Sequence, residues 1–170
     1  ALRDDPLAGR VLAGKWKLVS QTAKGPFFST YRAEPKTGGV PVSVKVLDPA
    51  LAEDDDRKRR FLENAGAALS LTDRRLLAVR EMAEEPLERV EGKARRAVYA
   101  VADAPGGPSL SDIVAKQGAL APARAVACVK GLLEALSAVH GAGLVHGDLH
   151  PACVFLEPDG SGREQVRVAD

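Results

Sequence analysis

The stretch LVHGDLHPACVFL, residues 144–156, places two histidines, an aspartate, a proline and a cysteine between hydrophobic flanks. A loop of this composition fits a metal site, a catalytic loop, or a catalytic loop that has lost part of its chemistry. His146, His150 and Cys153 are candidate zinc ligands, but three donors in one short loop without a distant fourth form a weak zinc pattern. The elements around the loop therefore have to decide between these interpretations.

The loop lies between a long helix and a hairpin. Residues 121–143 (APARAVACVKGLLEALSAVHGAG) predict the helix, with Pro122 near its first turn and a glycine at its end. One apolar face of this helix is formed by Val126, Val129, Leu133 and Leu136. Residues 153–170 (CVFLEPDGSGREQVRVAD) predict a β-hairpin with an Asp-Gly turn, and a shorter helix is expected at 109–118.

The first hundred residues predict a sheet with one helix. Alternating apolar runs separated by turn residues indicate five strands, at residues 16–23, 27–34, 40–47, 76–83 and 95–102. Residues 52–71 predict the helix, because three aspartates suit its positive N-terminal end and an apolar stripe follows them. At residues 103–109 (DAPGGPS) the composition changes to proline and glycine, which is typical of a connector.

These elements predict an α+β chain with two lobes. A five-stranded antiparallel N-lobe with one helix is expected at residues 16–102, preceded by an N-terminal extension at 1–15. Residues 103–108 are expected to form a hinge, and residues 109–170 a partial, mainly helical C-lobe.

Charge and cysteine content exclude several classes of function. The 170 residues include 24 Lys and Arg against 23 Asp and Glu, and only 4% are aromatic, so no nucleic-acid-binding surface is expected. The two cysteines, Cys128 and Cys153, form no C-x-x-C pair, which argues against a disulfide framework. A reducing cytoplasm is the expected location.

No membrane segment is expected in this chain either. The first ten residues (ALRDDPLAGR) lack the basic and apolar regions of a signal peptide. The most apolar stretch, residues 125–145, is interrupted by Lys130 and Glu134.

The order of the parts resembles the bacterial Ser/Thr (Hanks-type) protein kinase family. Four motifs occur in the family's order and at plausible spacings, namely VSVK (42–45), GGPSL (106–110), HGDLHP (146–151) and VRVAD (166–170). The resemblance extends from about Trp16 to the end of the chain and implies a protein-kinase-like fold that uses ATP and Mg²⁺.

The resemblance also implies roles for individual residues. Lys45 matches the strand lysine that holds nucleotide phosphates, and Asp148 matches the catalytic aspartate that accepts the proton of the substrate hydroxyl. Asp170 matches the Mg²⁺-binding aspartate of the D-F-G motif, whereas His146 is expected to be a hydrogen-bonded scaffold residue. The further nucleotide-binding residues implied by the resemblance are Gly25, Val101 and Asp103.

The glycine-rich loop and the helix glutamate of the family are both altered. In AKGPFFST (23–30) only Gly25 remains of the loop glycines, Phe28 replaces the third, and Pro26 has no backbone N–H, so phosphate binding should be weak. Asn64 stands where the family has the glutamate that pairs with the strand lysine. Glu63 lies one residue earlier, about 100° away around the helix, and would reach Lys45 only if the helix turned or slipped.

The loop around Asp148 also departs from the family. Cys153 replaces the asparagine that holds a second Mg²⁺, and a thiol is a poor ligand for this hard cation. His150 replaces a lysine, and Gly147 replaces the arginine that binds activation-loop phosphate. The chain ends at Asp170, so we expect a kinase truncated at the D-F-G aspartate.

The losses predict a pseudokinase, with weak or no ATP and Mg²⁺ binding and a regulatory or scaffolding role. One alternative is a fragment of an active ATP-dependent Ser/Thr protein kinase. Another is a small-molecule phosphotransferase of kinase-like fold, because HGDLHP also resembles the loop of aminoglycoside phosphotransferase-like enzymes. A protein partner or self-association is expected through the apolar face of the helix at 122–140.

Overall fold

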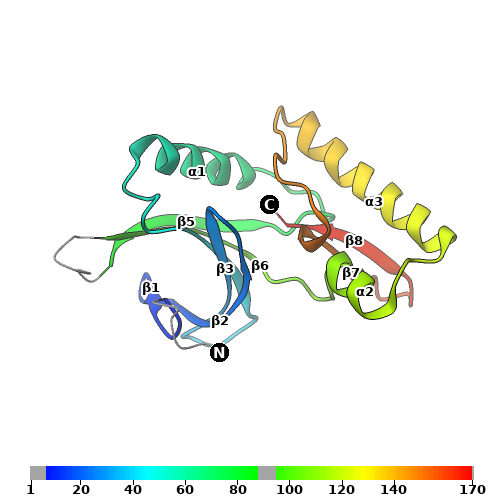
Figure 1. Cartoon of the computed structure of the whole chain (residues 1–170), viewed down its shortest axis with the longest axis horizontal. Helices are drawn as coiled ribbons and strands as arrows, with labels where there is room; N and C mark the ends of the chain where they lie inside the picture. The colour runs from blue at the N-terminus through cyan, green and yellow to red at the C-terminus, as the bar shows by residue number, and fades with distance from the viewer. Residues whose placement is uncertain (1–6, 88–94, 170) are drawn as a thin grey trace. The chain divides into compact units, whose positions relative to one another are not determined.

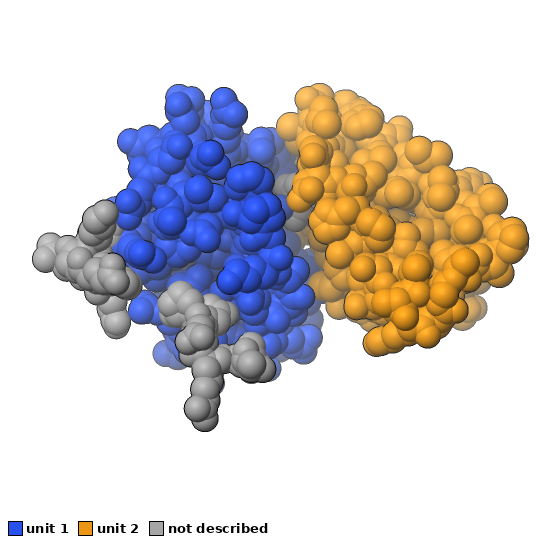
Figure 2. All heavy atoms as spheres, viewed as in Figure 1, with its two compact units in different colours: residues 1–69, 79–104 blue, residues 70–78, 105–170 orange. Residues whose placement is uncertain are grey.

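The computed structural model describes residues 7–87 and 95–169 of the chain. The chain forms two compact units, which Figure 2 distinguishes by colour. The first unit comprises residues 1–69 and 79–104, and the second comprises residues 70–78 and 105–170.

The first unit contains an antiparallel sheet of six described strands (Figure 1), in the order β1-β2-β3-β4-β6-β5. The strands are β1 (Val11–Leu12), β2 (Trp16–Lys24), β3 (Phe28–Pro35), β4 (Val42–Leu47), β5 (Val79–Pro86) and β6 (Arg96–Asp103). All five strands predicted from the sequence are present, and β1 is the addition. β1 pairs Val11 with Lys17 and Leu12 with Trp16 in β2. A two-residue strand is too short to produce an alternating signal, which explains why the sequence did not indicate it.

One face of this sheet forms a valine-rich core. Val42, Val44 and Val46 are at most 1% exposed, as their alternation along the sequence predicts. Leu7 and Leu12 belong to the same core, although both lie within the segment expected to be an extension. Burial of these two leucines makes at least residues 7–12 an integral part of the first unit.

The other face of the sheet packs against α1 (Asp55–Ala68), which lies beside β5 in Figure 1. The helix begins later than the sequence pattern predicts, because the Asp54 carboxylate accepts hydrogen bonds from the backbone N–H groups of Asp56 and Arg57. Both bonds lower the pKa of the Asp54 carboxyl group, and the bond from the Arg57 N–H has the larger effect. Gly66 allows close packing, since a Cβ there would lie 3.2 Å from the Met82 Cε atom.

The second unit contains two helices, a short 3-10 helix and a hairpin. They are α2 (Leu110–Gln117), α3 (Pro122–Gly141), η1 (Pro151–Cys153), β7 (Val154–Pro158) and β8 (Glu164–Val168). Ser109 and Asp112 form a capping box at the start of α2. Pro122 begins α3, as predicted. Arg124 of α3 contacts Glu164 of β8 through two hydrogen bonds of 2.8 Å, which helps to hold the helix on the hairpin.

Helix α3 is apolar on two faces, and only one of them is buried. Its buried residues are Cys128, Ala135 and Val139, which pack into the core of the second unit. The face predicted from the sequence is largely uncovered, with Val126, Val129 and Leu133 exposed at 69%, 52% and 61%. The residues that line this open apolar surface all lie on α3 itself. Throughout the described ranges, no helix combines the length and apolar character needed to cross a lipid bilayer.

Residues 70–78, expected within the N-lobe, pack with the second unit instead. The Leu77 N–H donates to the Val168 carbonyl at 2.8 Å, and the Val168 N–H donates to the Arg75 carbonyl at 2.7 Å. Arg75 also forms a salt bridge of 3.0 Å with Glu134 of α3. The last boundary between the units, after Ala104, lies inside the segment that the sequence marks as a hinge.

Candidate functional site

The turn between β2 and β3, which is expected to match the family's glycine-rich loop, is closed on itself. The Gly25 N–H donates to the Phe28 carbonyl at 2.8 Å, and Pro26 has no N–H to donate. The Phe27 carbonyl accepts from the Asp48 N–H at 2.9 Å, which ties the turn to the end of β4. Two of the backbone donors that such a loop could offer to phosphate are therefore missing or already used.

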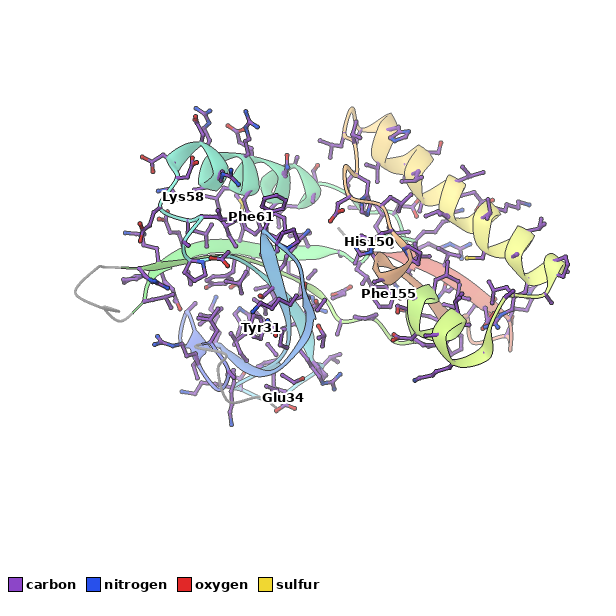
Figure 3. The ribbon with its side chains drawn as sticks, viewed as in Figure 1. Tyr31, Glu34, Lys58, Phe61, His150 and Phe155 are labelled. Atoms are coloured by element: carbon purple, nitrogen blue, oxygen red, sulfur yellow. The ribbon has the colours of Figure 1, made fainter. Side chains whose placement is uncertain are left out.

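Lys45 lies on β4, on the face opposite to Val44 and Val46, as the alternation predicts. Its ammonium nitrogen is 4.7 Å from the centroid of the Phe28 ring. The Phe28 ring in turn lies 5.5 Å from the ring of Phe61, centroid to centroid. Figure 3 shows Phe61 on the side of α1 that faces the sheet. Within residues 7–87 and 95–169, Lys45 forms no ion pair with a carboxylate.

Glu63 of α1 does not take the role of the helix glutamate that, in the family, pairs with the strand lysine. The Glu63 side chain is 66% exposed, and its nearest described cation is Arg59 of the same helix at 3.8 Å. Asn64 is exposed as well. Phe61 takes the sheet-facing position and is only 8% exposed. The helix is therefore not rotated in the way that Glu63 would need in order to reach Lys45.

Val101 and Asp103, expected to bind nucleotide, both lie on β6. The Val101 side chain is completely buried in the core formed with Val44. The Asp103 carboxylate accepts a hydrogen bond of 2.6 Å from the Arg80 guanidinium of β5. Packing and an ion pair thus engage both side chains, and nucleotide binding by these residues stays a prediction.

In the second unit, the stretch HGDLHP forms an open loop before η1. Asp148 is exposed, with 76% of its side chain accessible and the His150 Nε2 atom 3.9 Å from its carboxylate. His146 Nε2 lies 2.9 Å from the Ala169 carbonyl, so this nitrogen is the donor of the bond. That contact agrees with the scaffold role expected for His146. Gly147 has φ of 76°, a conformation that glycine adopts without strain.

Cys153 stabilises the backbone of the same loop. Its Sγ donates to the His150 carbonyl at 2.9 Å and accepts from the His150 N–H at 3.3 Å. The residue is 9% exposed. The thiol expected to replace the family's metal-binding asparagine is therefore directed at protein backbone.

The structure does not favour a zinc site in this loop. Besides the contacts of His146 and Cys153, His150 Nδ1 accepts from the Ala152 N–H at 3.3 Å. Across the described residues, no group of three or more His, Cys, Asp or Glu side chains is arranged to hold a metal ion. Asp170, the expected Mg²⁺ ligand, lies outside the described residues. The convergence of Lys45, Asp148 and Asp170 stays a prediction.

Sequence reasoning missed the contact between Phe28 and Lys45. The register of β3 and β4 contains the signal for it, because Thr30 lies opposite Lys45 and Phe28 lies opposite Leu47. Phe28 and Lys45 are therefore diagonal neighbours on one face of the sheet, within reach of long side chains. The sequence predicted both strands as neighbours but not the register in which they pair.

Comparison with known proteins gives consistent results. The chain is 30% identical over 166 residues to the serine/threonine-protein kinase PknL of Mycobacterium tuberculosis, covering 98% of this chain and 38% of that protein. It is 32% identical over 162 residues to the serine/threonine-protein kinase PkaA of Streptomyces coelicolor, covering 94% of this chain and 27% of that protein. No family model matches the chain.

Among solved structures, the chain resembles the kinase domain of PknI from Mycobacterium tuberculosis, with a TM-score of 0.74 and 25% identity. The match covers 96% of this chain and 60% of that domain. The chain thus spans well under half the length of the curated relatives named above. By sequence and by fold, its homologues are the bacterial Ser/Thr protein kinases, and the family resemblance indicated by its motifs is confirmed.

Proposed function

We propose that the chain is a kinase-like module with impaired phosphoryl transfer, which serves a regulatory or scaffolding role in a signalling protein. The observation that supports this most directly is the closed turn between β2 and β3, in which the Gly25 N–H is used internally and Pro26 offers none. Phosphoryl transfer depends on positioned charge around the γ-phosphate, so the loss of this cradle should affect it strongly.

ATP and Mg²⁺ fit the remaining residues only in part. Lys45 keeps a cationic group for the phosphates, with no described carboxylate to neutralise it. Asp170 would be the protein ligand for one Mg²⁺, which in this family neutralises phosphate charge. Cys153 is a poor ligand for a second ion, since its thiol is hydrogen-bonded to the backbone of His150. Weak nucleotide binding without efficient transfer is the result that we propose.

One observation favours the alternative of an active Ser/Thr kinase represented here by part of its sequence. Asp148 is exposed rather than paired tightly, so its carboxylate is accessible to a substrate hydroxyl. The named relatives are also serine/threonine-protein kinases. These relatives favour the protein-kinase branch over a small-molecule phosphotransferase.

Nucleotide binding can be tested by thermal-shift titration of the full-length protein with ATP, with and without Mg²⁺ or Mn²⁺. We expect a small stabilisation that Lys45→Ala removes, because a ligand that binds only the folded state raises its stability. Lys17→Ala is the matched control, since Lys17 is an exposed strand lysine of β2. An equal loss of the shift in both variants would argue against a phosphate site at Lys45.

Phosphoryl transfer can be tested with radiolabelled ATP and the same full-length protein. We expect no detectable incorporation of phosphate into the protein itself or a general kinase substrate. Activity that Asp148→Asn abolishes, and that Asp55→Asn leaves intact, would establish the active-kinase alternative instead. Asp55 is a suitable control because its side chain is 91% exposed on α1.

We also propose that a second protein surface covers the exposed face of α3. The basis is the run of exposed Val126, Val129 and Leu133 along one face of the helix. Self-association is the simplest form, and it is expected to show as a dimer in light scattering that Leu133→Glu dissociates. A monomer that stays soluble at high concentration would contradict this proposal. The cytoplasmic location remains a prediction.

A further inference from the structure

We propose that Phe28 is a positioning residue for Lys45, and that the aromatic pair of Phe28 and Phe61 links this lysine to α1. In this arrangement the ring of Phe28 takes the place of the helix carboxylate that the family resemblance leads one to expect. The use of Lys45 for nucleotide phosphate rests on the proposed function above. The contact between Lys45 and the Phe28 ring is independent of that function.

The first step is the contact between the ammonium group and the ring. The distance of 4.7 Å from Lys45 Nζ to the Phe28 ring centroid lies within the range of about 6 Å in which a cation is attracted to an aromatic face. The strand register permits it, because Phe28 and Lys45 are diagonal neighbours on the same face of β3 and β4. Backbone pairing therefore brings the two side chains within reach, and the rotamer of Lys45 completes the contact.

The second step is the attachment of this ring to α1. Phe28 and Phe61 lie 5.5 Å apart with an interplanar angle of 33°, within the distance range of interacting aromatic pairs. Phe61 is buried, so its own position is set by the core between α1 and the sheet. Next to this aromatic pair, a cation–π contact places the Arg57 guanidinium of α1 5.8 Å from the centroid of the Phe27 ring. Phe27 in the β2–β3 turn and Phe28 at the start of β3 thus both contact α1.

The third step concerns what the ring does for the lysine. A lysine side chain has four rotatable bonds, and ordering it costs rotamer entropy. The ring orders the side chain in advance without neutralising its charge, whereas a carboxylate would order and neutralise it together. Lys45 is only half-buried while the ring lies against its ammonium group. The lysine is thereby kept charged and oriented for an anionic ligand.

The position of Lys45 can be tested by NMR on the whole chain after reductive ¹³C-methylation of its lysines. Methyl groups above an aromatic face are shifted upfield by the ring current, and Lys45→Arg identifies the signal. We expect an upfield-shifted Lys45 signal in the unaltered protein. Phe28→Leu should return it to the position of exposed lysines, while Phe28→Trp, which keeps an aromatic face, should retain the upfield shift.

Phe27→Leu is the matched control, because it removes the adjacent ring and should leave the Lys45 signal upfield. A Lys45 signal at the ordinary position in the unaltered protein, or one that Phe28→Leu does not move, would overturn the proposal. If Phe28→Leu does not fold, Phe61→Leu replaces it, and the Lys45 signal should move toward the ordinary position as the ring loses its support.

A nucleotide titration separates this inference from the proposed function. If ATP binds, Phe28→Leu should weaken binding by about two- to fivefold through Lys45, and it should have no effect in a Lys45→Ala background. Tighter binding after Phe28→Leu would mean that the ring competes with phosphate, and would overturn the positioning role. If ATP does not bind at all while the upfield shift depends on Phe28, the nucleotide site is refuted and the contact stands.

Discussion

Gly107 lies in the segment that connects β6 to α2, at the point where this segment passes so close to β7 that no side chain fits. A Cβ atom at this position would be 2.1 Å from the Leu156 carbonyl oxygen and 3.2 Å from the Glu157 Cα atom. Both neighbours are backbone atoms, which cannot rotate away as a flexible side chain would. We therefore predict that Gly107→Ala forces the connecting segment and β7 apart by about 1 Å.

The expected cost follows from the contacts that this movement would break. The Leu156 N–H donates to the Pro108 carbonyl at 3.1 Å, and the Gly106 N–H donates to the Glu157 carboxylate at 2.7 Å. Each bond contributes about 1 kcal/mol, and overpacking adds about 1–3 kcal/mol. We expect the free energy of unfolding of the second unit to fall by about 3 kcal/mol.

Gly106→Ala is the matched control. A Cβ at Gly106 would be 3.5 Å from the Glu157 Cδ atom, which is an ordinary contact. The effect of the added methyl group on the unfolded chain is similar for both variants and cancels in their comparison.

Hydrogen exchange of the amides in the β7–β8 hairpin should be on the order of a hundredfold faster in Gly107→Ala than in Gly106→Ala. Equal exchange in the two variants would refute the reasoning.

Three further predictions concern other buried sites. Gly131→Ala should destabilise the chain by about 1–2 kcal/mol in urea unfolding, because its Cβ would lie 2.9 Å from the Val166 Cγ2 atom and 3.0 Å from the Val166 Cβ atom. In a Val166→Ala background, which removes the first of these contacts, the same substitution should cost less, and purely additive losses would contradict this contact. Burial raises the pKa of Tyr99 to about 12, so the stability linked to its neutral phenol is complete below pH 10 and is lost as the pH rises toward 12. Tyr99→Phe should therefore lose less stability than the unaltered protein between pH 10 and pH 12. The same pH dependence of unfolding in both proteins would count against this prediction. Burial, with a smaller effect of the nearby Glu164 carboxylate, raises the pKa of the Cys128 thiol. In a Cys153→Ala background, where Cys128 is the remaining thiol, a thiol reagent should therefore react on the order of tenfold more slowly with the native protein than with the protein in urea. Equal rates in the two conditions would show that the native thiol is accessible.

The elements of the fold were largely predictable because each has a local signal. Alternation along β4 and the proline at the start of α3 both appear in the structure as the sequence indicates. The signals that failed were those without a local period. β1 has only two residues, and residues 70–78 pack with the second unit through backbone bonds to β8 that no sequence pattern expresses.

The candidate site divides in the same way. By itself, the sequence determined that the chain resembles a kinase. It also predicted that Lys45 and Asp148 stand at motif positions and that glycines and an asparagine of the family are replaced. Only the tertiary structure decided that the Lys45 ammonium lies over the Phe28 ring, that Phe61 supports this ring from α1, and that the Cys153 thiol bonds to the loop backbone. The physical reason is that periodicity reports which face of an element is buried, whereas a contact between elements depends on strand register and packing, which no single segment encodes.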